Sequence, residues 1–228
     1  MLGTAETKIA DSGESDFHPD IRLPNSIPMQ KLLLFSDLHC DAAAAANLVE
    51  AARGVDVVIG AGDFANCRRR LNVCLEVLQA ITCPAVLVPG NNESHAELVS
   101  GCRHWNNAHV LHGSSVTING ISFFGLGGGI PTTPFGAWSF DLTEEQAAEL
   151  LADCPSGGVL VSHSPPHGAV DIASSGKSLG SRAVRAAIDR LHPLLVVCGH
   201  IHASAGQQAT IGPTRVINAG PGGVHWQI

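Results

Sequence analysis

The chain has 228 residues, enough for one compact domain, and its 45% hydrophobic and 14% charged residues are typical of a globular protein and argue against a disordered one. Thirteen Lys and Arg against twenty Asp and Glu give a formal charge of −7, which argues against non-specific binding to nucleic acid or an anionic membrane. Twelve His and no Tyr indicate a metal or proton-transfer site, because histidine is the commonest metal ligand.

The cysteines and the hydropathy pattern suggest a location. Seven cysteines without any C-x-x-C pair fit a reducing compartment better than a disulfide framework. The first residues lack the basic and apolar regions of a secretory signal, and no apolar run approaches the roughly 18 residues of a membrane helix. We therefore expect a cytoplasmic protein.

The predicted elements alternate between strands and helices. Residues 1–28 are polar and aperiodic and are predicted to form a flexible N-terminal extension, followed by a domain over 29–228. From residue 31, near-continuous apolar runs alternate with helical segments, which is typical of an α/β domain with strands covered on both faces. The predicted strands cover residues 31–36, 55–61, 85–89, 159–162 and 194–198, and the helices 41–53, 68–81, 93–103, 143–153 and 178–191.

Two regions interrupt this alternation. Residues 110–125 are predicted to form antiparallel strands around Asn119-Gly120, because Asn-Gly is the strongest short hairpin signal. A second hairpin is predicted over residues 209–219 through Gly212-Pro213.

Residues able to hold a metal follow each of the five strands. Asp37 and His39 come after the first strand, where alternate residues of an extended segment point the same way. Asp63, after the second strand, has two oxygens that could bridge two cations. The remaining candidates, after the last three strands, are Asn91, His163, and the alternating pair His200 and His202.

These seven side chains should meet at one edge. Ligands of open α/β sheets bind outside the carboxyl ends of the strands. Two Asp, one Asn and four His form a nitrogen and oxygen set suited to Mn, Fe, Zn or Ni. Asn218, at the end of another predicted strand, is interpreted as support for this shell. Any one of these short motifs is weak evidence by itself, but five motifs at the ends of successive strands predict a metal site.

The combined motif resembles that of the calcineurin-like metallophosphoesterases. The resemblance covers residues 31–223 and rests on Asp37-x-His39, Gly62-Asp63-x-x-Asn66, Gly90-Asn91-x-Glu93, His163 and Gly199-His200-x-His202. Residues 125–138, 163–168 and 216–222 resemble more particularly a bacterial branch near the cyclic-nucleotide phosphodiesterase-like enzymes. The resemblance implies a four-layer α/β/β/α sandwich, with two facing mixed sheets flanked by helices.

The same resemblance implies a binuclear site with two divalent metals, Mn foremost. Asp37, His39, Asp63 and His202 would hold one metal, and Asp63, Asn91, His163 and His200 the other. A water ionised between the metals would attack a small-molecule phosphoester, with a phosphodiester favoured. Oligomeric state is not readable from the sequence.

One position departs from the family pattern. Family members commonly have histidine where this chain has Asn92, and an amide cannot give up a proton at neutral pH. Asn92 could hydrogen-bond the phosphate, or His95 or His167 could supply the proton. Alternatively, the chain is a metal-binding regulatory or interaction protein with vestigial catalysis. We favour an enzyme, because all seven ligand positions remain.

The glycine-rich segment over residues 125–138 has two interpretations. It is either an ordinary loop after a hairpin or a lid whose Phe135 or Trp138 stacks on a base or aryl group of the substrate. The sequence does not decide between them.

Overall fold

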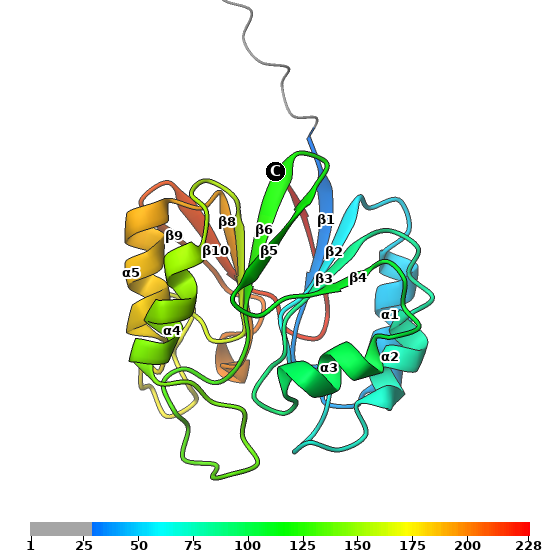
Figure 1. Cartoon of the computed structure of the whole chain (residues 1–228), viewed down its shortest axis with the longest axis horizontal. Coiled ribbons are helices and arrows are strands. Elements are labelled where there is room, and N and C mark those ends of the chain that lie inside the picture. Colours follow the sequence, from blue (N-terminus) through cyan, green and yellow to red (C-terminus); the bar gives the residue numbers. More distant parts are fainter. Residues whose placement is uncertain (1–28) are drawn as a thin grey trace, which may run out of the picture.

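Buried apolar strands form two facing β-sheets in the computed structural model, which describes residues 29–228 (Figure 1). The predicted extension over residues 1–28 lies outside the described residues. The first sheet has the order β11-β1-β2-β3-β4 and the second the order β5-β6-β7-β8-β10-β9. The strands of the first sheet are β1 (Lys31–Phe35), β2 (Val57–Gly60), β3 (Ala85–Leu87), β4 (Ala108–Val110) and β11 (Val224–Gln227). Those of the second are β5 (Ser114–Ile118), β6 (Ile121–Leu126), β7 (Val159–Ser162), β8 (Leu195–Cys198), β9 (Gln208–Ile211) and β10 (Thr214–Asn218).

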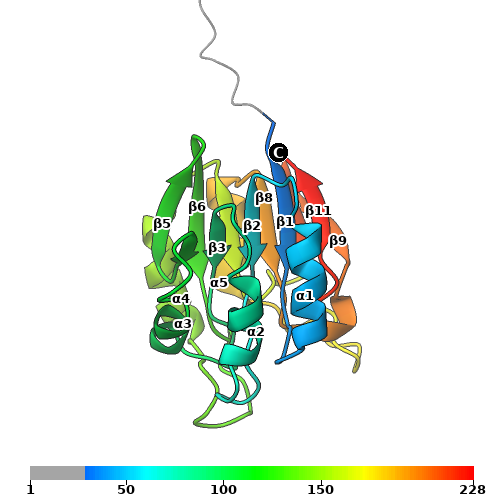
Figure 2. The same ribbon diagram turned by 90° about the vertical axis from the view of Figure 1, so that its right-hand side faces the viewer.

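Helices cover the outer face of each sheet (Figures 1 and 2). Those over the first sheet are α1 (Ala42–Ala51), α2 (Asn72–Leu78) and α3 (His95–Gly101). Those over the second are α4 (Glu144–Leu150) and α5 (Arg182–Leu191), and short 3₁₀ turns occupy Leu151–Asp153 and His202–Ser204. The predicted four-layer α/β/β/α sandwich is confirmed.

Alternating burial along the strands explains the layers. Leu32 and Leu34 of β1 point into the core between the two sheets, whereas Leu33 and Phe35 point into the core under α1 to α3. A third core lies between the second sheet and α4 with α5. Because both faces of the central strands are buried, these strands are continuous apolar runs.

Both predicted hairpins are confirmed. β5 pairs antiparallel with β6 around Asn119 and Gly120, which have φ angles of 51° and 84°. β9 pairs antiparallel with β10 around residues 212–213. Pairs β1–β2, β2–β3, β6–β7, β7–β8 and β8–β10 are parallel, so both sheets are mixed. The strands β4 and β11 were not predicted.

Three helices, α2, α3 and α5, begin two to four residues later than predicted. The segment 68–71 is a loop in which Arg68 and Arg70 have positive φ angles, so α2 begins at Asn72. Glu93 binds backbone N–H groups in the preceding loop, and Ser94 caps α3. The α5 helix begins after its cap, Ser181, and not at 178. A capping box of Thr143 and Gln146 starts α4.

Candidate metal centre

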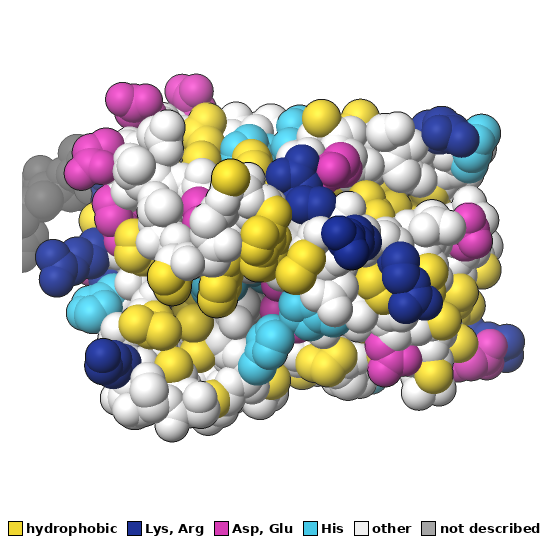
Figure 3. All heavy atoms as spheres, turned by 90° about the horizontal axis from the view of Figure 1, so that it is seen from below, with side chains coloured by type: hydrophobic (Ala, Val, Ile, Leu, Met, Phe, Trp, Pro, Cys, Tyr) yellow, Lys and Arg dark blue, Asp and Glu magenta, His cyan; other side chains and the backbone are white. Residues whose placement is uncertain are grey.

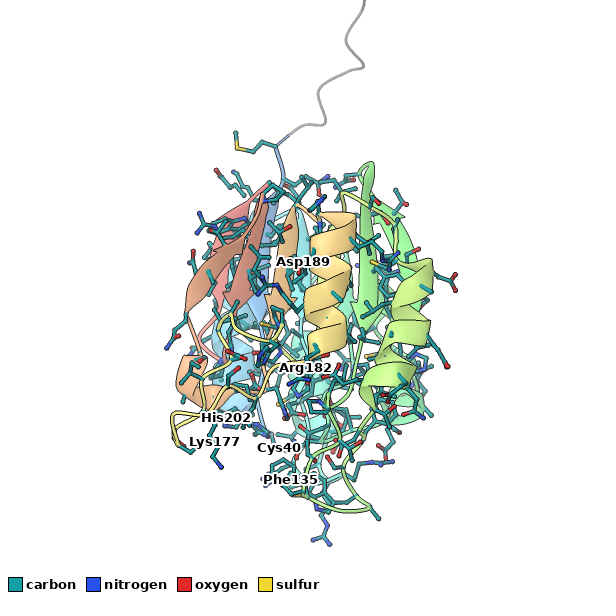
Figure 4. All side chains as sticks on the ribbon, turned by 90° about the vertical axis from the view of Figure 1, so that its left-hand side faces the viewer. Cys40, Phe135, Lys177, Arg182, Asp189 and His202 are labelled. Carbon is teal, nitrogen blue, oxygen red and sulfur yellow. The ribbon has the colours of Figure 1, made fainter. Side chains whose placement is uncertain are left out.

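The seven predicted ligands lie at one end of the sandwich, in the loops that follow the carboxyl ends of β1, β2, β3, β7 and β8 (Figure 1). Parallel strands of both sheets end there, which brings residues far apart in sequence together. Figure 4 places His202 at this end, with Cys40 and Phe135. Figure 3 views this end and shows histidine side chains gathered beside Lys and Arg side chains.

The first group of candidate ligands is Asp37, His39, Asp63 and His202, whose ligand atoms lie within 4.8 Å of one another. Asp37 Oδ1 is 3.5 Å from His202 Nε2, and Asp63 Oδ2 is 3.5 Å from His39 Nε2. The two histidine Nε2 atoms are 3.0 Å apart. His202 is exposed, so this group is open to solvent on one side.

The second group shares Asp63 with the first. It contains Asp63, His163 and His200, again with ligand atoms within 4.8 Å of one another. Asp63 Oδ1 is 3.5 Å from His163 Nε2, and Asn91 Oδ1 is 3.3 Å from the same nitrogen. The two oxygens of Asp63 therefore face different groups, one oxygen to each.

This donor set fits two divalent cations. Metal–ligand bonds of about 2.1 Å on opposite sides of one ion span about 4.2 Å, close to the spread of each group. Imidazole nitrogens with carboxylate and amide oxygens suit Mn, Fe, Zn or Ni.

The backbone is strained where the candidate ligands lie. Asp37, His39, Asp63 and His200 have φ angles of 57°, 45°, 60° and 65°, which non-glycine residues rarely adopt. Such conformations cost about 1–3 kcal/mol each and cluster at functional sites. Gly90 allows a close approach here, because a Cβ atom at this position would collide with the Asp63 carboxylate and backbone. Strain at four ligand positions supports a site that depends on their placement.

The surrounding charges set the protonation of the buried ligands. Burial and, after it, the nearby charge of His163 lower the pKa of His200 to about 3, so His200 is a neutral imidazole that can bind metal. Burial raises the pKa of Asp37, but the His202 hydrogen bond, the charge of His163 and the Ser36 hydroxyl outweigh it and lower the pKa to about 2. Asp37 is therefore an ionised carboxylate at neutral pH.

Glu93 organises the loops around Asp63. This fully buried carboxylate accepts hydrogen bonds from the backbone N–H groups of Asp63, Ala65 and Gly90 at 2.9, 2.9 and 2.7 Å. Burial and the nearby Asp63 charge raise the pKa of Glu93 to about 7, against the effect of these N–H donors. Glu93 belongs to the Gly90-Asn91-x-Glu93 motif, and this hydrogen bonding was not predicted from the sequence.

Asn92, where the family commonly has histidine, holds Asp63 and the next loop in place. Its side-chain Nδ2 donates to Asp63 Oδ2 at 2.7 Å and its backbone N–H to Asp63 Oδ1 at 2.9 Å. Its Oδ1 accepts from the Cys67 backbone at 2.8 Å. The Asn92 amide is thus engaged by protein groups on both sides, and its catalytic role stays a prediction.

The two histidines proposed as proton donors have partners of their own. His95 begins α3, and its ring lies 5.5 Å from that of His112. His167 Nδ1 is 3.0 Å from the Ser178 hydroxyl, which donates to the buried carboxylate Asp171. Within residues 29–228, no hydrogen bond joins either histidine to the seven candidate ligands. Their catalytic roles stay predictions.

Phe135 and Trp138 stack on each other in the loop after β6. Their ring centroids are 5.7 Å apart with an interplanar angle of 15°, and Phe135 is about half exposed. The Trp138 carbonyl accepts from Arg68 at 3.3 Å. Their contact with substrate stays a prediction.

Asn218 supports the loop that carries His200. Its fully buried Nδ2 donates to the carbonyls of Gly199 and Ile201, each at 3.1 Å, on both sides of the histidine. The structure thus places Asn218 behind the candidate ligands.

Asn218→Ala is expected to lower the free energy of unfolding by about 1–3 kcal/mol, because two buried carbonyls lose their donor. Urea unfolding of the metal-free protein measures this change. Gln208→Ala, at an exposed position of β9, should stay within about 0.5 kcal/mol of wild type. An Asn218→Ala midpoint equal to that of wild type would contradict the role.

Comparison with known proteins agrees with the resemblance seen in the sequence. A family model described as Calcineurin-like phosphoesterase matches residues 30–204. A search of curated proteins finds no match. Within residues 29–228, no helix is long and apolar enough to cross a membrane.

Several solved structures have a similar fold at low sequence identity. A Thermus thermophilus protein has 19% identity and a TM-score of 0.67, over 84% of this chain and 89% of that one. A dimetal phosphatase from Danio rerio has 16% identity and a TM-score of 0.59, over 83% and 86% of the chains. A phosphopantetheinyl hydrolase from Mycobacterium tuberculosis has 17% identity and a TM-score of 0.53, over 83% of this chain and 88% of that one.

Proposed function

Since this chain belongs to the calcineurin-like phosphoesterase family, we propose that it is a binuclear metal-dependent hydrolase of a small phosphoester, with a phosphodiester favoured. The observation that carries the proposal is the sharing of Asp63 between two groups of ligand atoms. We assign one cation, preferably Mn²⁺, to Asp37, His39, Asp63 and His202, and a second to Asp63, Asn91, His163 and His200.

Two bound cations would neutralise phosphoryl oxygens and activate water for attack. The protein's own residues hold this arrangement. Asp63 spans the two positions, and Asn92 fixes both of its oxygens through two hydrogen bonds. His200, kept neutral by burial, offers a lone pair without needing to lose a proton. Asn92 thereby acts as a positioning residue in this proposal.

Positive side chains beside the centre favour an anionic substrate. Arg68, Arg69 and Arg70 are exposed in the loop that follows Asp63, and Arg68 forms an ion pair with Glu97 at 2.6 Å. Lys and Arg side chains lie next to the histidines in Figure 3. Basic groups at a cleft attract anions and raise the rate of encounter. The chain as a whole carries a formal charge of −7, so attraction of an anion here depends on these local side chains.

The diester preference rests on the family resemblance and on Asn92 standing where the family commonly has histidine. No proton donor occupies that position, so a substrate with a good leaving group depends less on general-acid catalysis, which is typically worth about 10²–10⁴-fold. The same observation supports a second candidate function, a metal-binding regulatory protein with vestigial catalysis. The two candidates differ in turnover and not in metal content.

The test is hydrolysis of a chromogenic phosphodiester and its matching monoester by the full chain, with Mn²⁺ added or removed by chelator. We expect turnover that depends on Mn²⁺ and is greater on the diester. His200→Ala should lower turnover by on the order of 10²-fold or more, because it removes a ligand of one cation.

The outcomes separate the two candidates. Protein that binds two Mn²⁺ ions yet hydrolyses neither ester with any divalent metal would support the regulatory function. Turnover that is unchanged in His200→Ala would overturn the ligand assignment. Greater turnover on the monoester would overturn the diester preference alone.

A further inference from the structure

The loop between β6 and α4 (residues 127–143), which carries Phe135 and Trp138, packs against the candidate metal centre. At its base, Gly128 donates to the Pro89 carbonyl at 3.0 Å, and Phe140 donates to the Asn91 carbonyl at 2.9 Å. On the other side, Ile130 donates to the hydroxyl of Ser164, the residue after His163, at 2.8 Å. The loop thus contacts both segments that carry Asn91 and His163.

One side-chain network links this loop to the Asn91 amide. Asn91 Nδ2 donates to Ser139 Oγ at 3.0 Å, and Ser139 Oγ donates to Asp141 Oδ1 at 2.7 Å. Asp141 Oδ2 accepts from the Thr133 hydroxyl at 2.7 Å and from the Thr133 backbone N–H at 2.8 Å. Both oxygens of Asp141 are therefore engaged within the loop.

The chemistry of this network decides which end of the Asn91 amide faces the metal centre. A hydroxyl has one hydrogen to donate, and a carboxylate only accepts, so Ser139 gives its hydrogen to Asp141. Toward Asn91, Ser139 can then act only as an acceptor, which requires the NH₂ group there. The amide oxygen is consequently left facing His163 Nε2, at 3.3 Å. Asn91 itself is almost fully buried, so water does not compete for this choice.

We infer that Ser139 and Asp141 are positioning residues that orient the amide oxygen of Asn91 toward the cation held with His163, an inference that rests on the proposed function. The segment that carries Phe135 and Trp138 thereby also carries the support of a metal ligand. Groups that orient metal ligands are typically worth about 10- to 100-fold in metal affinity.

The experiment titrates Mn²⁺ into the metal-free full chain by calorimetry. Asn91→Ala identifies the binding step that depends on this ligand. We expect Ser139→Ala and Asp141→Asn to weaken that same step by about 10- to 100-fold. Asp141→Asn is informative because it keeps the volume, yet its amide can donate to Ser139 and so release the hydroxyl to donate to the Asn91 oxygen.

Matched variants separate positioning from general packing. Ser139→Thr keeps the hydroxyl and should bind both ions with affinities close to wild type. Thr132→Val removes an exposed hydroxyl of the same loop, outside the network, and should leave both steps unchanged. Circular dichroism establishes that each variant is folded.

Two results would overturn the inference, and they are distinguishable. If Asn91→Ala loses a step while Ser139→Ala and Asp141→Asn keep wild-type affinities, the positioning role is wrong and the two-metal proposal stands. If wild-type protein binds fewer than two Mn²⁺ ions, the proposed function and the inference fail together.

Discussion

Asp63→Asn is expected to remove both metal-binding steps and to lower phosphoester hydrolysis by on the order of 10³-fold or more, since bound metals are worth several kcal/mol to such reactions. The reason is geometric. Asp63 presents Oδ2 to the group that contains His39 and Oδ1 to the group that contains His163, each at 3.5 Å. An asparagine has the same volume but one oxygen and no charge, so it cannot serve both groups.

Metal analysis after dialysis against Mn²⁺, together with turnover, measures the effect. Asp189→Asn is the matched control, because Asp189 lies on α5, away from the centre, and pairs with Arg185 on the surface (Figure 4). This exposed pair contributes little to stability, so the control should bind two ions and retain activity. An Asp63→Asn protein that still holds two Mn²⁺ ions would refute the bridging role.

The positions of the candidate ligands could be predicted because the ends of buried parallel strands can be recognised in the sequence. Buried strands are unbroken apolar runs, so the polar residue that follows each run marks the edge where ligands gather. Asp37, Asp63 and His163 each follow such a run, and the structure brings them to one end of the sandwich. The order of the apolar runs and the polar residues that follow them were sufficient to predict where the candidate ligands gather.

Asn218 was predicted as a supporting residue, because it ends a predicted strand, but Ser139 and Asp141 were not, because Asn91, which their network reaches, is distant in sequence. Ser139 is 48 residues from Asn91, and its hydroxyl carries no local signal of its role. The edge strand β11 was missed for a related reason, since its buried and exposed residues are mixed and it pairs with β1 at the opposite end of the chain. Helix starts shifted where side chains such as Glu93 bind loop N–H groups. Such contacts appear only once the chain has folded.

Glu93→Ala is expected to lower the free energy of unfolding by about 3–5 kcal/mol, the largest stability effect that we predict. Three backbone N–H groups, those of Asp63, Ala65 and Gly90, would lose their acceptor in a region with no exposure to water. Each buried donor left without a partner costs about 1–3 kcal/mol. Thermal unfolding of metal-free protein should show a midpoint lower by roughly 10 °C, from about 2–4 °C per kcal/mol for a chain of this size.

Glu149→Ala provides the control for Glu93→Ala, because Glu149 is exposed on α4 and its loss should change the midpoint by at most a degree or two. The Glu93→Ala variant also tests whether the metal centre depends on this buried carboxylate, which is not itself a candidate ligand. Glu93 ties the loop after β2 to the loop after β3, and those loops carry Asp63 and Asn91. If the two loops are held together by Glu93, the folded fraction of Glu93→Ala should bind Mn²⁺ more weakly than wild type. Wild-type metal affinity together with a lower midpoint would restrict Glu93 to stabilising the fold.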